Sequence, residues 1–276
     1  MKHACGIVLY NPSNNDIENI VYFSNIFNMV FLYCNSVLND DVTQKINTIN
    51  NICLLGSGNN DGLSVACEIL CEEAKQNTCD YIMLFDQDSR MEESHIREML
   101  KYADVNNIDS SKVAIFCPQI VLRENDPIIK INKFVDWCIT SGSLIDLSVF
   151  NYGINFDKNY YIDRVDIDFC RQITLNGFKI FSIGSVYLMQ ELGDHRKIFG
   201  MNYYEHSPIR HYYIARNRMY YNTKYDEKIV ITFLQIARHL FEIVFCEHNK
   251  ISKIIMIKRG IEDFFAGRMG AYCRSD

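Results

Sequence analysis

The first 120 residues of the chain alternate short apolar runs with longer segments in which apolar residues recur at helical spacing. The apolar runs, which predict buried strands, are residues 5–10, 29–34, 51–56, 81–85 and 112–118. The helical segments between them are residues 13–27, 63–76 and 92–106. This repeated strand–helix order predicts an α/β fold, in which helices cover both faces of a mostly parallel central sheet.

The pattern changes after residue 130. Shorter strands and turns continue to about residue 190, and residues 207–245 have the pattern of amphipathic helix before a basic stretch at 250–260. We therefore expect an α/β domain over residues 1–205, with a first half of about 1–120 and a second half of about 121–205. A C-terminal helical extension is expected over residues 206–276.

Composition limits the class of protein. Hydrophobic residues at 48% and charged residues at 22% are ordinary for a folded globular chain. The net charge of −6 gives no general basic surface for nucleic acid, so a nucleic-acid partner is not expected. Eleven scattered cysteines without a CxxC pair favour reduced thiols in a cytoplasm. The longest apolar run, from Ile229 to Ala237, falls short of the about 20 residues that span a bilayer.

Two carboxylates follow the apolar run at 81–85. On an extended segment, residues two apart project to the same face, so Asp86 and Asp88 are expected to converge on one point. Converging carboxylates repel each other unless a cation lies between them, and Mg²⁺ or Mn²⁺ with substrate phosphates suits such a pair. The alternative is structural, because Asp88 or Ser89 would also cap the following helix.

A second acidic cluster contains Asp163, Asp166 and Asp168, with Arg164 and Arg171 beside them. The segment is either extended, so that Asp166 and Asp168 share a face, or the start of a helix. Clustered carboxylates raise the pKa of one member enough to make it a general base near neutral pH. Acidic residues are equally typical of a helix N-terminus, where they interact with the helix dipole, and both interpretations stay open.

The motifs taken together resemble the bacterial rhamnosyltransferase branch of the family 2 glycosyltransferases, over roughly residues 5–222. The segments that carry the resemblance are GIVLYNP, LYCNS, NNDGLSVA, DYIMLFDQDS, ITSGSLIDLSVF, YYIDRVDIDFCRQ and SPIRHYYIARN. The resemblance implies a GT-A fold, a nucleoside-diphosphate sugar donor, Mg²⁺ or Mn²⁺ as cofactor and inversion of the anomeric centre. It also implies that the donor is dTDP-L-rhamnose and the acceptor a hydroxyl of a cell-surface glycan, such as O-antigen, or of a lipid-linked saccharide.

The resemblance also assigns residues to roles, with Asp166 as the catalytic base. The donor-binding residues that it implies are Tyr10, Asn11, Pro12, Asn35, Asn60, Gly62, Asp86, Arg210, Arg216 and Asn217. The expected acceptor-binding residues are Trp137, Ser141, Gly142, Asp163 and Asp168, although a lone tryptophan such as Trp137 is more often part of a core. The expected metal ligands are Asp86, Asp88 and His195.

Three positions depart from the family pattern. Cys34-Asn35 replaces the usual Asp-Asn pair, Gln190 stands where the HxxG element has its histidine, and Asn60 lies in an unusually acidic loop. His195 is the candidate substitute for the missing histidine. Because of these departures, a different UDP- or GDP-sugar donor and a catalytically decayed sugar-binding protein are kept as alternatives. A nucleotidyltransferase is disfavoured, because no basic glycine-rich signature accompanies the first strand.

The C-terminal region permits two interpretations. Residues 229–245, followed by Lys250, Lys253, Lys258 and Arg259, suit an anionic membrane surface, which would make the protein peripheral on the inner face of the cell membrane. Alternatively, the apolar face packs on the catalytic domain or on another subunit of a homo-oligomer.

Overall fold

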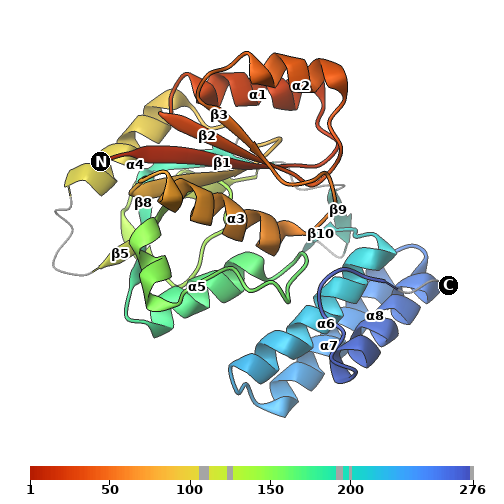
Figure 1. The fold of residues 1–276 in the computed structure, drawn as a ribbon. Coiled ribbons are helices and arrows are strands. Elements are labelled where there is room, and N and C mark those ends of the chain that lie inside the picture. The colour runs from red at the N-terminus through yellow and green to blue at the C-terminus, as the bar shows by residue number, and fades with distance from the viewer. Residues whose placement is uncertain (106–111, 123–126, 191–194, 199–200, 274–276) are drawn as a thin grey trace. The chain divides into compact units, whose positions relative to one another are not determined.

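A computed structural model describes residues 1–105, 112–122, 127–190, 195–198 and 201–273 (Figure 1). For residues 195–198 and 201–204 it describes the backbone only. The chain divides into two compact units. The sheet unit comprises Met1–Asp157 and Asp166–Gln190, and the helical unit comprises Lys158–Val165 and Glu191–Asp276. The division therefore falls at residue 190 instead of the expected 205, and the helical unit also takes the segment before Asp166.

Eight strands form the central sheet of the sheet unit, in the order β3-β2-β1-β4-β7-β5-β8-β6. Strands β1 to β4 and the pair β5–β8 are parallel, whereas β7 and β6 run antiparallel to their neighbours. The expectation of a mostly parallel α/β sheet is confirmed. The strands are β1 (His3–Leu9), β2 (Met29–Cys34), β3 (Ile52–Leu55), β4 (Tyr81–Asp86), β5 (Val113–Val121), β6 (Lys133–Val135), β7 (Ser143–Asp146) and β8 (Lys179–Met189).

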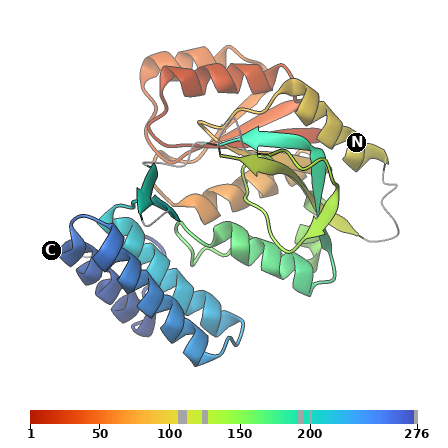
Figure 2. The ribbon, with the colours of Figure 1, turned by 180° about the vertical axis from the view of Figure 1, so that it is seen from behind.

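Helices cover both faces of this sheet, as Figures 1 and 2 show from opposite sides. One face carries α1, α2 and α4, and the other carries α3 and α5. The helices are α1 (Asn14–Ser24), α2 (Asp40–Asn47), α3 (Leu63–Gln76), α4 (Glu93–Val105) and α5 (Val165–Leu175), with a 3₁₀ turn, η1 (Leu147–Tyr152). Because both faces are covered, the inner strands are apolar on both sides, which explains their continuous apolar runs.

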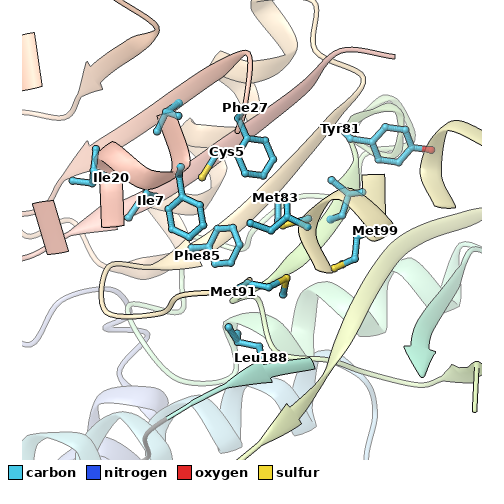
Figure 3. Packing of buried hydrophobic residues seen from close by; sticks show 14 of the residues in the cluster. Cys5, Ile7, Ile20, Phe27, Tyr81, Met83, Phe85, Met91, Met99 and Leu188 are labelled. Carbon is cyan, nitrogen blue, oxygen red and sulfur yellow. The ribbon is translucent and has the colours of Figure 1, made fainter. Parts of the chain in front are cut away.

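The main core lies between the sheet and helices α1, α2 and α4 (Figure 3). Ile7 of β1 and Phe85 of β4 are buried in it, and the ring of Phe85 stacks on Phe23 of α1 at 4.3 Å between centroids. Met91 and Leu188 extend the same cluster toward the carboxyl ends of β4 and β8. This packing fixes the edge of the sheet at which the polar strand ends gather.

The helical unit contains a strand pair and three helices. They are β9 (His195–Ile198), β10 (Met201–Tyr204), α6 (Pro208–Lys224), α7 (Ile229–Cys246) and α8 (Lys250–Phe265). The expected helical character of residues 207–245 is confirmed, and Asp226, which adopts a left-handed backbone (φ 52°), lies between α6 and α7. Helices α6 and α8 approach closely at Gly260, where a Cβ atom would lie 2.5 Å from the carbonyl oxygen of Tyr212.

Candidate active site

The first part of the site is built by the carboxyl ends of β1 and β2, which are neighbouring parallel strands. The backbone N–H of Asn35 donates to Leu9 O (2.8 Å), and that of Asn11 donates to Ser36 Oγ (2.7 Å). Asn11 takes a left-handed backbone (φ 47°), a strained conformation that turns the chain sharply after β1. The exposed side chains of Tyr10 and Asn11 therefore lie at the sheet edge where ligands of α/β proteins bind.

Asn35 ties this edge to the loop after β3. Its buried side chain accepts from Asp61 N (3.1 Å) and donates to Gly62 O (3.4 Å), and Tyr33 donates through its hydroxyl to the Asp61 carboxylate (2.8 Å). Both functional groups of the Asn35 amide are thus engaged in positioning the loop. The neighbouring Asn60 is exposed, so of these two predicted donor residues it is the one that faces solvent.

Gln87, the middle residue of the Asp-Gln-Asp motif, connects the ends of β1 and β4 by hydrogen bonds. Tyr10 N donates to Gln87 Oε1 (2.7 Å), and Gln87 Nε2 donates to Tyr10 O (3.2 Å) and to Asp16 Oδ2 (3.3 Å). The sequence analysis missed this residue, because a glutamine between two aspartates gives no signal of a partner 77 positions away. Gln87 fixes the spacing between the first loop and the acidic motif.

Asp86 and Asp88 are arranged differently from the expected extended pair. Asp86 ends β4, but Gln87 and Asp88 form a turn that the hydrogen bond from Ser89 N to Asp86 O (3.0 Å) closes. The prediction of an extended segment is therefore wrong here. The capping alternative is also wrong, because α4 begins only at Glu93. Asp88 is exposed, and Asp86 is partly buried at the strand end.

Asp86 is the electrostatic centre of the site. Burial, and after it the negative charges of Asp88 and Asp166, raise the pKa of Asp86 to about 6, against a lowering contribution from a hydrogen bond with Ser141. The pKa of the buried Cys67 thiol is raised mainly by burial and in addition by the charges of Asp86 and Asp166. Two carboxylates that are 80 positions apart in the sequence thus lie within electrostatic reach of each other in the sheet unit.

Gln190, the residue that replaces the histidine of the family pattern, donates through Nε2 to Asp86 Oδ2 at 3.4 Å. A long neutral hydrogen bond holds the carboxylate without neutralising its charge. His195, the candidate substitute, lies in β9, and its side chain is outside the part of the chain that the structure describes. Its predicted metal role stays a prediction.

Asp166 lies in the first turn of α5, so the helix-start interpretation is confirmed and the extended one is wrong. Its neighbour Asp168 is 1% exposed and accepts from Gln172 Nε2 (2.8 Å) one turn further along the helix. This inward contact orders α5. The expected role of Asp168 in acceptor binding is therefore not favoured, whereas Asp166 remains partly exposed.

The backbone before α5 is strained. Asp163 (φ 71°) and Arg164 (φ 61°) are consecutive left-handed residues, which cost free energy unless neighbours hold them. Within the helical unit, Asn217 Nδ2 donates to Ile162 O (2.7 Å) and Asp163 O (3.1 Å), and the Asp163 carboxylate lies 3.6 Å from Arg210. Burial raises the pKa of Asp163, and Arg210 opposes the rise. These contacts hold the segment that leads to Asp166.

No protein-family model matches the chain. The chain is 24% identical over 271 residues to the dTDP-rhamnosyl transferase RfbF of Shigella flexneri, covering 92% of this chain and 91% of that protein. It is 23% identical over 198 residues to the rhamnosyltransferase WbbL of Escherichia coli K12, covering 62% of this chain and 74% of the relative.

Solved structures agree on the fold. The S. aureus TarS 1–349 structure with UDP-GlcNAc superposes with a TM-score of 0.57 at 12% identity, covering 96% of this chain and 73% of that chain. The complex of the same protein with UDP gives a TM-score of 0.56 at 11% identity. This chain has the GT-A fold and is a glycosyltransferase, and its sequence is similar to those of bacterial rhamnosyltransferases. The fold, the enzyme class and the resemblance expected from the sequence are confirmed.

In this glycosyltransferase the Ser141-Gly142 turn supports the acidic motif. The buried Ser141 Oγ accepts from Asp86 N (3.1 Å) and donates to Ser89 Oγ (3.0 Å). Gly142 (φ 76°) donates to Leu84 O (2.7 Å), and a Cβ atom there would lie 3.0 Å from Met91 Cε. The expected contact of this turn with the acceptor is therefore not favoured, because the turn instead positions Asp86.

Arg216 and Asn217 are buried inside the helical unit, each 0% exposed. Arg216 donates to Tyr212 OH (3.2 Å) and Arg268 O (3.4 Å), and its guanidinium stacks over the rings of Tyr212 and Tyr213. Such contacts stabilise α6. The predicted binding of the donor by Arg216 and Asn217 is not favoured by these positions, whereas the side chain of Arg210 is 35% exposed.

Trp137, a predicted acceptor-binding residue, is exposed to solvent. Its side chain is 55% exposed, so it does not belong to the core. It lines a groove of about 280 Å³ in the sheet unit, together with Gln119, Lys133 and Cys138. Cys138 Sγ lies 3.9 Å from Cys170 Sγ, one helical turn after Asp166. The groove therefore contacts α5, the helix that carries Asp166.

Proposed function

We propose that this glycosyltransferase moves L-rhamnose from dTDP-L-rhamnose to a hydroxyl group of a saccharide, with inversion at the anomeric carbon. The relative that covers most of the chain is named a dTDP-rhamnosyl transferase, and the second relative is named a rhamnosyltransferase. The observation that carries the proposal is that Asp86, at the end of β4, lies within electrostatic reach of Asp88 and of Asp166, which is in the first turn of α5. In this displacement the acceptor hydroxyl forms a bond to the anomeric carbon while the bond to the nucleoside diphosphate breaks. One carboxylate can take the hydroxyl proton, and others can hold the cation that would stabilise the leaving diphosphate.

Asp166 is the proposed general base. An acceptor hydroxyl has a pKa far above 7, so it needs a carboxylate to take its proton as it attacks the anomeric carbon. Inversion needs one base on the face opposite the leaving group and no protein nucleophile. Asp166 suits this role because it is partly exposed at the start of α5, while Asp168 beside it is buried and hydrogen-bonded.

Asp86 and Asp88 are the proposed ligands of Mg²⁺ or Mn²⁺. Among the residues that the structure describes, no group of three or more His, Cys, Asp or Glu side chains is arranged to hold a metal. The two carboxylates fit instead a cation that the donor diphosphate shares, since Mg²⁺ typically takes one or two carboxylates and substrate phosphates. The charges of Asp88 and Asp166, which add to burial in raising the pKa of Asp86, support this, because a cation would offset that negative charge. When bound, the cation would stabilise the leaving diphosphate.

The proposed acceptor is a free or lipid-linked saccharide in the cytoplasm that is destined for the cell surface. The groove beside Trp137 supports a sugar ligand, since exposed aromatic faces next to polar groups suit pyranose rings. Gln119 and Lys133 supply hydrogen-bonding groups on the groove wall. Trp137, rather than the Ser141-Gly142 turn, is therefore the acceptor contact that we propose.

The test is transfer from dTDP-L-rhamnose to saccharide acceptors, with UDP- and GDP-sugars as competing donors. We expect Asp166→Asn to abolish transfer while donor affinity stays nearly unchanged, because only the proton acceptor is lost. Asp136→Asn, at an exposed carboxylate, is the matched control and should transfer normally. Full activity of Asp166→Asn, or a strong loss of its donor affinity, would overturn the base assignment. Donor binding without transfer to any saccharide would instead favour a sugar-binding protein.

A further inference from the structure

Helix α7 turns Thr232, Gln235 and His239 toward the interior of the helical unit. Asn222 of α6 donates through Nδ2 to Thr232 Oγ1 (2.8 Å) and to Gln235 Oε1 (3.0 Å). Further along, His239 Nε2 lies 2.8 Å from His211 Nδ1, and both rings are buried. The inner face of α7 is therefore joined to α6 by polar contacts from its first turn to its middle.

The polar interior continues beyond the end of α7. His211 Nε2 lies 2.9 Å from the carboxylate of Glu247, which is 4% exposed. The buried Lys253 of α8 donates to the same carboxylate and to Glu205 Oε1 (2.7 Å). Soluble helical bundles normally bury apolar stripes and expose polar ones, so this interior is unusual. The apolar cluster among the described residues of the unit is small: Ala215, Ile243 and Ile257, with Leu240 and Ile261 beside them.

Most apolar residues of α7 face outward instead, apart from Ile243 and Leu240, which belong to that cluster. Phe233, Leu234 and Phe241 are 72%, 61% and 61% exposed. At 100° per residue, seven exposed apolar positions fall within one arc of about 120°, and the exposed Ile229 and Ile231 lie just beyond its two ends. The seven positions within the arc, which we call the outer face of α7, are Val230, Phe233, Leu234, Ala237, Phe241, Val244 and Phe245. A continuous exposed apolar stripe of this size marks a contact surface rather than ordinary surface variation.

Charge distinguishes the two units. The helical unit, residues 158–165 and 191–276, carries 16 Lys and Arg against 11 Asp and Glu, a net charge of +5, whereas the sheet unit carries 12 against 23, a net charge of −11. Lys228 precedes the outer face, and Lys250 and Lys258 follow it on α8, all three of them exposed. An apolar stripe flanked by lysines in the cationic part of an acidic protein complements a lipid surface with anionic headgroups.

We propose that the outer face of α7 inserts into the surface of an anionic lipid bilayer. The inference deepens the proposed function and rests on it, because it names the partner that would bring a lipid-linked acceptor to the enzyme. Phenylalanine and leucine would enter the boundary between headgroups and acyl chains, and the lysines would contact the anionic headgroups.

The helix lies in the plane of the membrane surface rather than across it. By length and composition α7 is the one helix among the described residues that could cross a membrane, with 18 residues and a mean hydropathy of 1.7. However, 18 residues rise only about 27 Å, slightly less than the hydrocarbon core. The inner face is also tied to α6 by Thr232 and Gln235, and Arg238 on one edge is 83% exposed. A spanning α7 would have to break these contacts and bury that charge.

Vesicle flotation of the full chain tests the proposal, with vesicles of phosphatidylcholine alone or mixed with phosphatidylglycerol. We expect the protein to float with the anionic vesicles and to be released by high salt. Leu234→Glu/Phe241→Glu should lower vesicle binding by more than about tenfold, since both side chains lose their apolar burial. Val21→Glu, at an exposed apolar position of α1, is the matched control and should bind as the unmodified protein does.

Two further measurements keep the outcomes distinct. Light scattering without lipid tests whether a second copy of the chain covers the outer face of α7 instead. The proposal would be overturned in favour of a second copy if the unmodified protein is a dimer that does not bind vesicles and Leu234→Glu/Phe241→Glu makes it a monomer. Stabilisation by dTDP-L-rhamnose should be equal in the unmodified and substituted proteins. Stabilisation without vesicle binding overturns the membrane inference alone, and vesicle binding without stabilisation by any nucleotide sugar overturns the donor assignment alone.

Discussion

Replacing Asp86 by asparagine should stabilise the metal-free protein at neutral pH. Burial and the charges of Asp88 and Asp166 raise the pKa of Asp86 from 3.8 to about 6. At about 1.4 kcal/mol per pKa unit, ionising this carboxyl group costs the folded state up to about 3 kcal/mol. Asparagine keeps the size of the side chain and removes its charge. We therefore expect the free energy of unfolding of Asp86→Asn to exceed that of the unmodified protein by about 1–3 kcal/mol at pH 7.

The sign of this effect sets its pH window. Because the folded-state pKa is raised, the unfolded chain loses the Asp86 proton at lower pH than the folded chain does, so this group's contribution to stability falls as pH rises from about 4 to about 6. Urea unfolding in EDTA at pH 4, 5, 6 and 7 measures it. The advantage of Asp86→Asn should be near zero at pH 4 and complete above pH 6. A variant that is less stable at pH 7, or an advantage that is equal at all four pH values, would refute the reasoning. Asp136→Asn is the control and should show neither change.

Four other perturbations test the geometry. Gln87→Leu removes the hydrogen bonds with Tyr10 and should raise the KM for the donor severalfold with little change in kcat, measured by initial rates. Asn217→Ala removes two hydrogen bonds from the strained segment before Asp166 and should lower the free energy of unfolding by about 1–3 kcal/mol in urea titrations, with Asn25→Ala, on the exposed end of α1, as control. Gly142→Ala should cost at least about 1 kcal/mol, because of its positive φ and the contact with Met91, and unchanged thermal stability would contradict this. Trp137→Ala should weaken acceptor binding while leaving donor binding intact, which calorimetry with each ligand would distinguish.

The sequence predicts those features that depend on local pattern. The apolar runs give the strands, because inner strands of a covered parallel sheet are apolar on both sides. The position of Asp86 after such a run also places it correctly at the carboxyl end of β4. For Asp166 the sequence leaves an extended segment and a helix start both open, because acidic residues suit either, and the structure shows the helix start.

Features that depend on contacts between distant segments are not readable from local pattern. Ser141 looks like an acceptor-side residue, yet its hydroxyl contacts Asp86 N, 55 positions away. Gln190 looks like a lost metal ligand, yet it donates to Asp86 across 104 positions. The buried state of Arg216 is unexpected for a charged residue, and it depends on Tyr212 and Tyr213 packing around the guanidinium. Asp88 was expected in an extended segment, but the turn from Asp86 to Ser89 reverses the chain there.

The account rests on a donor site in which Asp86 and Asp88 hold a cation together with the diphosphate of dTDP-L-rhamnose. Calorimetric titration of the unmodified protein with this donor, once in Mn²⁺ and once in EDTA, tests that claim most directly. We predict tight binding in Mn²⁺ that weakens by at least about tenfold in EDTA, with UDP- and GDP-sugars binding more weakly in both buffers. Equal affinity in the two buffers, or no binding of dTDP-L-rhamnose in Mn²⁺, would contradict the account.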